Sequence, residues 1–273
     1  MDIFFKEYDY NASKQWCMDH ERFLIKAVAF YLISIFGIKY FMKDRKPFSF
    51  EKPLIIWNAI LSTFSLLGFL FITPTLFNVI QKHGITHTYK HITELQTDTY
   101  KHITELQTGK VAGYWTFLWV VSKIPEFVDT FFIVLRKKPL MFMHWYHHAL
   151  TGYYAFVNFY EDNAHMIWIV WVNYFIHFCM YGYYMLRALH FRIPPQVAQT
   201  LTLAQMVQFS ISLASMAHLT VLHYTTTQHL AFTFRGIFIA AFMLSTYFVL
   251  WLRFYNISYL QAGGKKYVQH QEK

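Results

Sequence analysis

Seven runs of about 20 apolar residues constrain what this chain can fold into. A helix of that length matches the hydrocarbon thickness of a bilayer, and a helix satisfies its own backbone hydrogen bonds there. The runs are 23–42, 54–80, 113–135, 140–160, 164–186, 196–222 and 231–255. We therefore predict an all-α integral membrane protein with seven transmembrane helices, formed as one membrane domain over residues 1–273, with a polar loop at 81–112 and a polar tail at 256–273.

Composition agrees with a membrane protein. The chain is 55% hydrophobic and 21% aromatic but 14% charged, which is unusual for a soluble domain. Its net charge of +9 comes from Lys and Arg scattered over short loops, and this pattern does not favour nucleic acid binding. The two cysteines, Cys17 and Cys179, have no spacing typical of a metal site or a disulfide framework.

The loop charges predict an orientation. Thirteen Lys and Arg residues lie on one side of the predicted membrane, in the loops after the first, third and fifth apolar runs and at the C-terminal end. Seven lie on the opposite side. Because cytosolic loops carry the excess of positive charge, we expect the N-terminus in the lumen or exterior and the C-terminus in the cytosol.

The polar loop 81–112 holds a repeat. The ten residues TYKHITELQT occur at 88–97 and again at 99–108, which indicates a local tandem duplication. Histidines recur in this loop with spacings that resemble metal ligands, but a solvated surface is the simpler interpretation.

Four of the apolar runs carry polar residues that a bilayer disfavours. Each set follows a helical i, i+3 or i+4 spacing, so its members share one helix face. The sets are Lys123, Glu126 and Asp129; His144, His147 and His148; Asn173, His177, Tyr181 and Tyr184; and Thr202, Gln205 and Gln208. Taken singly, each set has a simpler structural interpretation. The first could be a structural ion pair, and the second could be histidines that hydrogen-bond between helices. The third could be an interfacial tyrosine belt, and the fourth could be side chains that hydrogen-bond between helices.

The depth of these sets favours one site. With the predicted orientation, all four lie between the middle of the bilayer and its cytosolic surface, and the residues on the lumenal side of them are mostly apolar. We therefore predict a polar chamber open to the cytosol, above an apolar shaft closed at the lumenal end. Such a cavity suits a long amphiphile that reacts at its polar end.

The four sets also resemble known motifs. Lys123-x-x-Glu126-x-x-Asp129-Thr130, His144-x-x-His147-His148, Asn173-x-x-x-His177-x-x-Met180-Tyr181 and Thr202-x-x-Gln205-x-x-Gln208, in that order, are similar to the signature motifs of the ELO family of very-long-chain fatty acid elongases. The resemblance extends over nearly the whole chain. The H-x-x-H-H motif by itself is less specific, because membrane di-iron desaturases use it too.

The resemblance implies a multi-pass protein of the endoplasmic reticulum membrane in which six of seven helices enclose a tunnel. It implies condensation of a long-chain acyl-CoA with malonyl-CoA to 3-oxoacyl-CoA, CO2 and CoA, with no metal and no cofactor. The acyl group is expected on His147 as an acyl-imidazole, with Asn173 fixing the tautomer of that histidine, and with His148 and His177 donating to thioester or enolate oxygens. The implied catalytic residues are His144, His147, His148, Asn173 and His177. The implied substrate-binding residues are Lys123, Glu126, Asp129, Tyr181, Tyr184, Gln205, Gln208 and Arg253.

Further expectations concern substrate and partners. Trp145-Tyr146 inside the histidine motif resembles the subgroup that acts on saturated and monounsaturated chains of about palmitate length. Expected partners are membrane lipid and the 3-oxoacyl-CoA reductase, dehydratase and enoyl-CoA reductase of the elongation cycle, and a homodimer is left open. Two alternatives also stay open on the residues: a di-iron desaturase or hydroxylase, and a seven-helix receptor or transporter.

Overall fold

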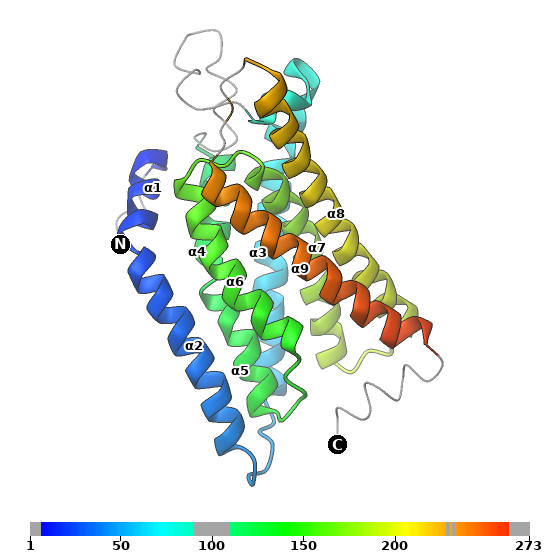
Figure 1. Cartoon of the computed structure of the whole chain (residues 1–273). Coiled ribbons are helices and arrows are strands. Elements are labelled where there is room, and N and C mark those ends of the chain that lie inside the picture. The colour runs from blue at the N-terminus through cyan, green and yellow to red at the C-terminus, as the bar shows by residue number, and fades with distance from the viewer. Residues whose placement is uncertain (1–6, 90–109, 228–229, 231–232, 262–273) are drawn as a thin grey trace.

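The computed structural model describes residues 7–89, 110–227, 230 and 233–261, and the elements that these residues form are helices (Figure 1). Most of the duplicated segment and residues 262–273 of the tail lie outside the described residues. In chain order the elements are α1 (Tyr10–Asp19), α2 (Glu21–Phe41), α3 (Glu51–His83), the short 3₁₀ helix η2 (Ile85–Tyr89), α4 (Ala112–Ser122), the 3₁₀ turn η6 (Pro125–Phe127), α5 (Val128–Leu135), α6 (Phe142–Tyr160), α7 (Met166–Ala188), α8 (Pro195–Thr225), α9 (Phe234–Tyr255) and the π-helical turn η7 (Asn256–Leu260).

Helices occupy all seven predicted ranges. Fewer of these helices are both long enough and apolar enough to cross a membrane. Three helical segments in the described part of the chain are long and apolar enough to cross a membrane: α2, α3 and the segment Phe234–Leu260 that joins α9 to η7. The range 113–135 is divided between two helices of 11 and 8 residues. The other helices, α6, α7 and α8, carry the polar motif residues, which lower their mean hydropathy. A membrane protein is supported, and the count of seven spans stays a prediction.

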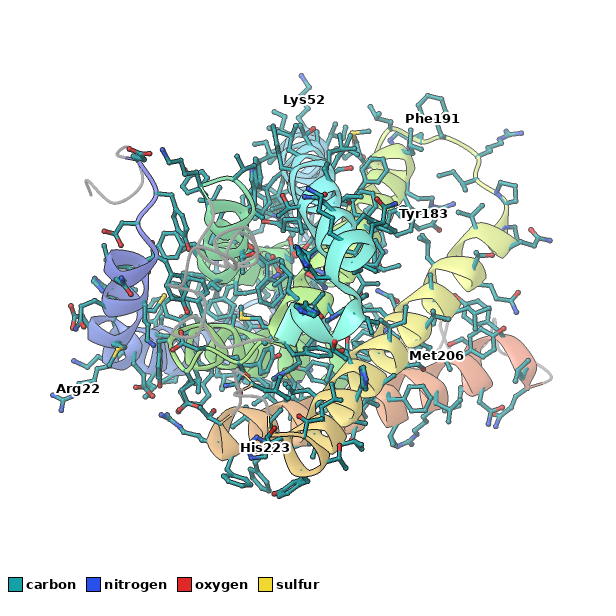
Figure 2. The ribbon with its side chains drawn as sticks, turned by 90° about the horizontal axis from the view of Figure 1, so that it is seen from above. Arg22, Lys52, Tyr183, Phe191, Met206 and His223 are labelled. Carbon is teal, nitrogen blue, oxygen red and sulfur yellow. The ribbon has the colours of Figure 1, made fainter. Side chains whose placement is uncertain are left out.

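The helices run back and forth between two ends of the molecule. Figure 1 shows α3, α6 and α8 running opposite to α2, α7 and α9, so that the α2–α3, α5–α6 and α7–α8 connections lie at one end. Helix α3 packs along α7, α8 packs on α7 and α9, and α6 packs against α2, α1 and α9. Seen from above in Figure 2, α1 and α2 lie on one side, and α8 and α9 cross each other on another.

Helix α1 was not among the predicted elements, because its residues lack a long apolar run. Its first turn is capped by Asp9, whose carboxylate accepts the Ala12 N–H at 3.0 Å. Two of its side chains, Tyr10 and Lys14, contact Asp162 in the turn between α6 and α7. A polar tether therefore fixes this short helix to the bundle.

The run predicted as one span at 113–135 is interrupted at Pro125. Proline has no backbone N–H, so it cannot donate the hydrogen bond that an α-helix requires at that position. The chain tightens into 3₁₀ geometry, in which Ile124 N–H donates to Val121 O at 3.2 Å and Phe127 N–H donates to Ile124 O at 3.1 Å. The interruption falls inside the first polar motif.

A polar cluster lies at the other end of the bundle, where α6 ends and α9 begins. The guanidinium of Arg235 on α9 donates to Glu21 of α2 at 2.9 Å and to Glu161 after α6 at 3.1 Å. It also donates to the Tyr153 hydroxyl at 2.8 Å. This cluster ties three helices together at the end opposite to the histidine motif.

The close contact between α3 and α7 generates a stability prediction. A Cβ placed on Gly68 of α3 would lie 2.3–2.5 Å from ring carbons of the buried Tyr174 on α7. Because such overpacking costs more than the helix propensity gained from alanine, Gly68→Ala should destabilise the protein by about 1–2 kcal/mol. Thermal unfolding in detergent measures the effect.

The matched control is Gly37→Ala in α2, where the new Cβ would meet nothing within 4 Å. This variant should unfold at the wild-type temperature or above. Equal unfolding temperatures for the two variants would show that α3 does not approach α7 as closely as described.

Candidate active site

The 3₁₀ turn places a buried ion pair at the start of the site. Lys123 Nζ lies 2.6 Å from Glu126 Oε1, and their side chains are 3% and 5% exposed. The Ser122 hydroxyl donates to the same carboxylate oxygen at 3.1 Å, and Lys123 Nζ also lies 4.5 Å from the centre of the Trp119 ring. The two charges satisfy each other, as charges buried among apolar helices must.

Asp129, one turn further along, is held by donors from two other helices. Its Oδ1 accepts the indole N–H of Trp57 on α3 at 2.5 Å, and its Oδ2 accepts the Tyr181 hydroxyl of α7 at 2.6 Å. The same Oδ2 lies 4.0 Å from Nε2 of His148 on α6. One carboxylate therefore links α3, α5, α6 and α7.

The three histidines on α6 have different surroundings. His144 Nε2 lies 2.9 Å from the Thr130 hydroxyl, which is itself 2.8 Å from the hydroxyl of Tyr31 on α2. His148 is buried beside Asp129. The ring of His147 instead faces α9, with centroid distances of 4.9 Å to Tyr247 and 5.6 Å to Trp251.

The α7 residues line the same region. Asn173 is buried, and its side-chain oxygen accepts the indole N–H of Trp119 at 2.8 Å. In the described part of the chain no hydrogen bond joins Asn173 to His147, so the expected fixing of the His147 tautomer by Asn173 does not appear in this geometry. His177 is buried and contacts the Tyr181 ring at 5.3 Å between centroids.

Two glutamines extend the site onto α8. Gln205 accepts the indole N–H of Trp251 at 2.9 Å and donates to the sulfur of Met180 at 3.4 Å. Gln208 is buried, and its side-chain oxygen has no hydrogen-bond partner among the described residues. Such an acceptor is available to a bound molecule or water.

Two of the predicted substrate-binding residues lie less deep. Tyr184 is 47% exposed, and Arg253, near the end of α9, is exposed as well. Tyr184 lies near the end of α7 and Arg253 in the last turn of α9. In the connection after α5, the Lys137 ammonium donates to the backbone oxygens of Lys43 and Arg45 at 2.9 and 3.0 Å.

Several residues that contact the motifs could not be identified from the sequence. They are aromatic residues within apolar runs, where a single polar atom gives no periodic signal. These residues are Tyr31, Trp57, Trp119, Tyr247 and Trp251.

Among the described residues, no group of three or more His, Cys, Asp or Glu side chains is placed to hold a metal ion. What the site does present is a frame of neutral and charged hydrogen-bond donors around three imidazoles. Imidazoles in such a frame can act as nucleophiles, bases or donors.

Comparison with known proteins finds fatty acid elongases among the relatives of this chain. Long chain fatty acid elongase 1 of Caenorhabditis elegans is 38% identical over 252 residues, which cover 92% of this chain and 83% of the relative. Very long chain fatty acid elongase 6 of Drosophila melanogaster is 34% identical over 266 residues, 96% of this chain and 80% of the relative. Human very long chain fatty acid elongase 6 is 29% identical over 257 residues, 94% of this chain and 92% of the relative. The sequence model of the ELO family, described as the GNS1/SUR4 family, matches residues 16–267, and this chain therefore belongs to the ELO family.

Proposed function

We propose that this protein condenses a long-chain acyl-CoA with malonyl-CoA through an acyl-imidazole on His147. Family membership and the named elongase relatives support the condensation step of fatty acid elongation. The residue that carries the acyl group is inferred from the surroundings of the three histidines.

The observation that carries the assignment is the freedom of the His147 ring. His144 is engaged by Thr130, and His148 faces the carboxylate of Asp129. The ring nitrogens of His147 have no hydrogen-bond partner among the described residues, and its ring is partly exposed between Tyr247 and Trp251. The His148 nitrogens are likewise without a hydrogen bond among the described residues, but that ring is buried. His147 is therefore the one of the three whose nitrogens are both unoccupied and accessible, as a nucleophile requires.

The reaction then proceeds in two halves. A His147 nitrogen attacks the thioester carbonyl of the acyl-CoA, the C–S bond breaks, and CoA leaves with the proton that the imidazole loses. Malonyl-CoA next loses CO2, and the resulting enolate attacks the acyl carbon. The new C–C bond forms as the C–N bond to His147 breaks, and the imidazole takes up one proton. The products are 3-oxoacyl-CoA, CO2 and CoA.

The neighbouring residues supply orientation and charge stabilisation. His148 and His177 are buried in the same region and would donate to the oxyanion of each half reaction. Glu126, Lys123 and Asp129 hold the frame around them. Tyr181, Gln205 and Gln208 would contact the polar part of the substrate, and Tyr184 and Arg253, at the exposed end, would contact CoA.

The cellular setting follows from the same proposal. Seven spans, with six enclosing a tunnel closed at its lumenal end, would bury the acyl chain while CoA stays in the cytosol. We place the protein in the endoplasmic reticulum membrane with a lumenal N-terminus and a cytosolic C-terminus. Its product requires a reductase, a dehydratase and an enoyl-CoA reductase to complete a cycle.

The proposed acyl substrate is a saturated or monounsaturated chain of about palmitate length. Support comes from the Trp145-Tyr146 pair inside the histidine motif. Within the structure, the Tyr146 hydroxyl lies 3.1 Å from that of Thr246, and its ring lies 5.8 Å from Tyr247, which contacts His147. Tyr146 is thus connected to the nucleophile through α9.

Replacement of His147 tests the covalent step. Purified His147→Ala, incubated with acyl-CoA and no malonyl-CoA, should form no acyl-enzyme, because the attacking nitrogen is gone. Intact-protein mass spectrometry measures the acyl adduct, and peptide mapping locates it. As a control, His218→Ala removes an imidazole of α8 outside the motifs and should label like the wild type. A His147→Ala protein that still carries the acyl group elsewhere would overturn the assignment.

A substrate panel tests the reaction and its alternatives together. Wild-type protein given malonyl-CoA and acyl-CoAs of graded length should release 3-oxoacyl-CoA, with the highest turnover near palmitate length. Mass spectrometry of the products and iron analysis of the same preparation separate the possibilities. Absence of product at every length would overturn the elongase proposal, and stoichiometric iron with oxygen-dependent desaturation would replace it with a desaturase.

A further inference from the structure

We propose that Trp57, which lies outside all four motifs, is a positioning residue that aims Asp129 at His148 during condensation. The inference rests on the proposed function. It adds a residue of α3, a helix that supplies no motif residue, to those on which the reaction depends.

The first step concerns the carboxylate itself. Asp129 lies one helical turn beyond Glu126, and its side chain is 13% exposed. Both of its oxygens are occupied by neutral donors: Oδ1 by Trp57 at 2.5 Å and Oδ2 by Tyr181 at 2.6 Å. A carboxylate held at both oxygens cannot rotate about its last side-chain bond. Hydrogen bonds to a charged acceptor are also roughly twice as strong as those between neutral groups.

The second step concerns His148. Its Nε2 lies 4.0 Å from the Oδ2 that Tyr181 also holds. At this distance the two atoms form no direct hydrogen bond, so the carboxylate acts on the ring through its charge, which favours a proton on Nε2 over one on the other nitrogen. The orientation of Asp129 is therefore transmitted to a ring that neighbours His147, at 5.3 Å between centroids.

The third step is the rigidity of the helix that carries Trp57. Along the same helix, the Ser62 hydroxyl donates to the Phe178 backbone oxygen of α7 at 3.0 Å, and Gly68 permits close contact with Tyr174. Helix α3 and α7 thus form one unit, from which Trp57 and Tyr181 reach the two oxygens of Asp129. Two donors fixed to one unit hold the carboxylate in place before substrate arrives, as catalysis by preorganised groups requires.

The Trp57→Phe variant removes the N–H donor and keeps an aromatic ring. We expect kcat for 3-oxoacyl-CoA formation to fall roughly ten-fold, the typical effect of losing one hydrogen bond to a charged group, with KM for acyl-CoA changed less than two-fold. A structural defect would instead lower the amount of folded protein and alter both constants.

The matched control is Trp171→Phe. The indole N–H of Trp171 on α7 donates to the Thr73 hydroxyl of α3 at 2.9 Å, so this change removes a hydrogen bond of the same type between the same two helices, away from Asp129. The control should keep wild-type kcat. Equal kcat for Trp57→Phe and Trp171→Phe, in a preparation whose wild type forms product, would overturn the inference.

A double-mutant cycle with Asp129→Asn tests the route. If Trp57 acts through the carboxylate, adding Trp57→Phe to Asp129→Asn should change kcat by less than two-fold. A further ten-fold fall in the double variant would show that Trp57 acts elsewhere.

Should Trp57→Phe fail to fold, 3-benzothienylalanine at position 57 replaces the N–H by sulfur in a ring of the same size, and the same ten-fold fall is expected. A wild type that forms no product would overturn the proposed function instead, so the two failures are distinguishable.

Discussion

Charges buried in an apolar helical bundle must be paired, and that constraint organises this protein. An unpaired ionised side chain away from water costs several kcal/mol, so each such group has to meet a partner of opposite charge or a set of hydrogen-bond donors. Lys123 and Glu126 satisfy each other across one turn. Asp129 has no ion pair with a Lys or Arg among the described residues and is satisfied by Trp57 and Tyr181. Those two donors come from α3 and α7, so pairing a single carboxylate fixes the relative position of three helices.

The break at Pro125 falls within this pairing. Lys123 follows the last residue of α4 and Glu126 lies in the 3₁₀ turn, and their charged groups are 2.6 Å apart. Helix α5 then starts again and carries Asp129 and Thr130 toward α6, where they lie close to His148 and His144. The proline thus lies between the two partners of the ion pair, and the helix that follows it carries the two residues that lie nearest the histidines.

The sequence predicted a large part of this arrangement. Helices occupy the seven apolar ranges, and the four polar sets lie close to one another, because periodic spacing on a helix face is visible in the residues themselves. Helix α1 was missed, since its ten residues contain no long apolar run. It is held by the polar contacts of Asp9 and Asp162 and by a few buried side chains such as Tyr10 and Cys17. Trp57 was missed for another reason. Its single N–H gives no pattern, and its partner depends on how α3 is rotated about its axis, which a sequence does not specify.

The different surroundings of the three histidines follow from helix geometry. Residues 144 and 148 are one turn apart and share a face, and their ring centroids are 4.6 Å apart, so both turn toward the α5 frame. Residue 147 is rotated from that face by one position and meets α9, where Tyr247 donates to its backbone oxygen at 2.9 Å and covers its ring. The H-x-x-H-H spacing thus divides the imidazoles between two walls. One wall is polar: it holds His144 by the hydrogen bond to Thr130 and places Asp129 4.0 Å from His148. The other wall is aromatic and leaves the nitrogens of His147 without a partner among the described residues. The H-x-x-H-H spacing resembles a metal motif in sequence. In this fold it places the ring of His147 against α9, apart from the rings of His144 and His148, which face α5.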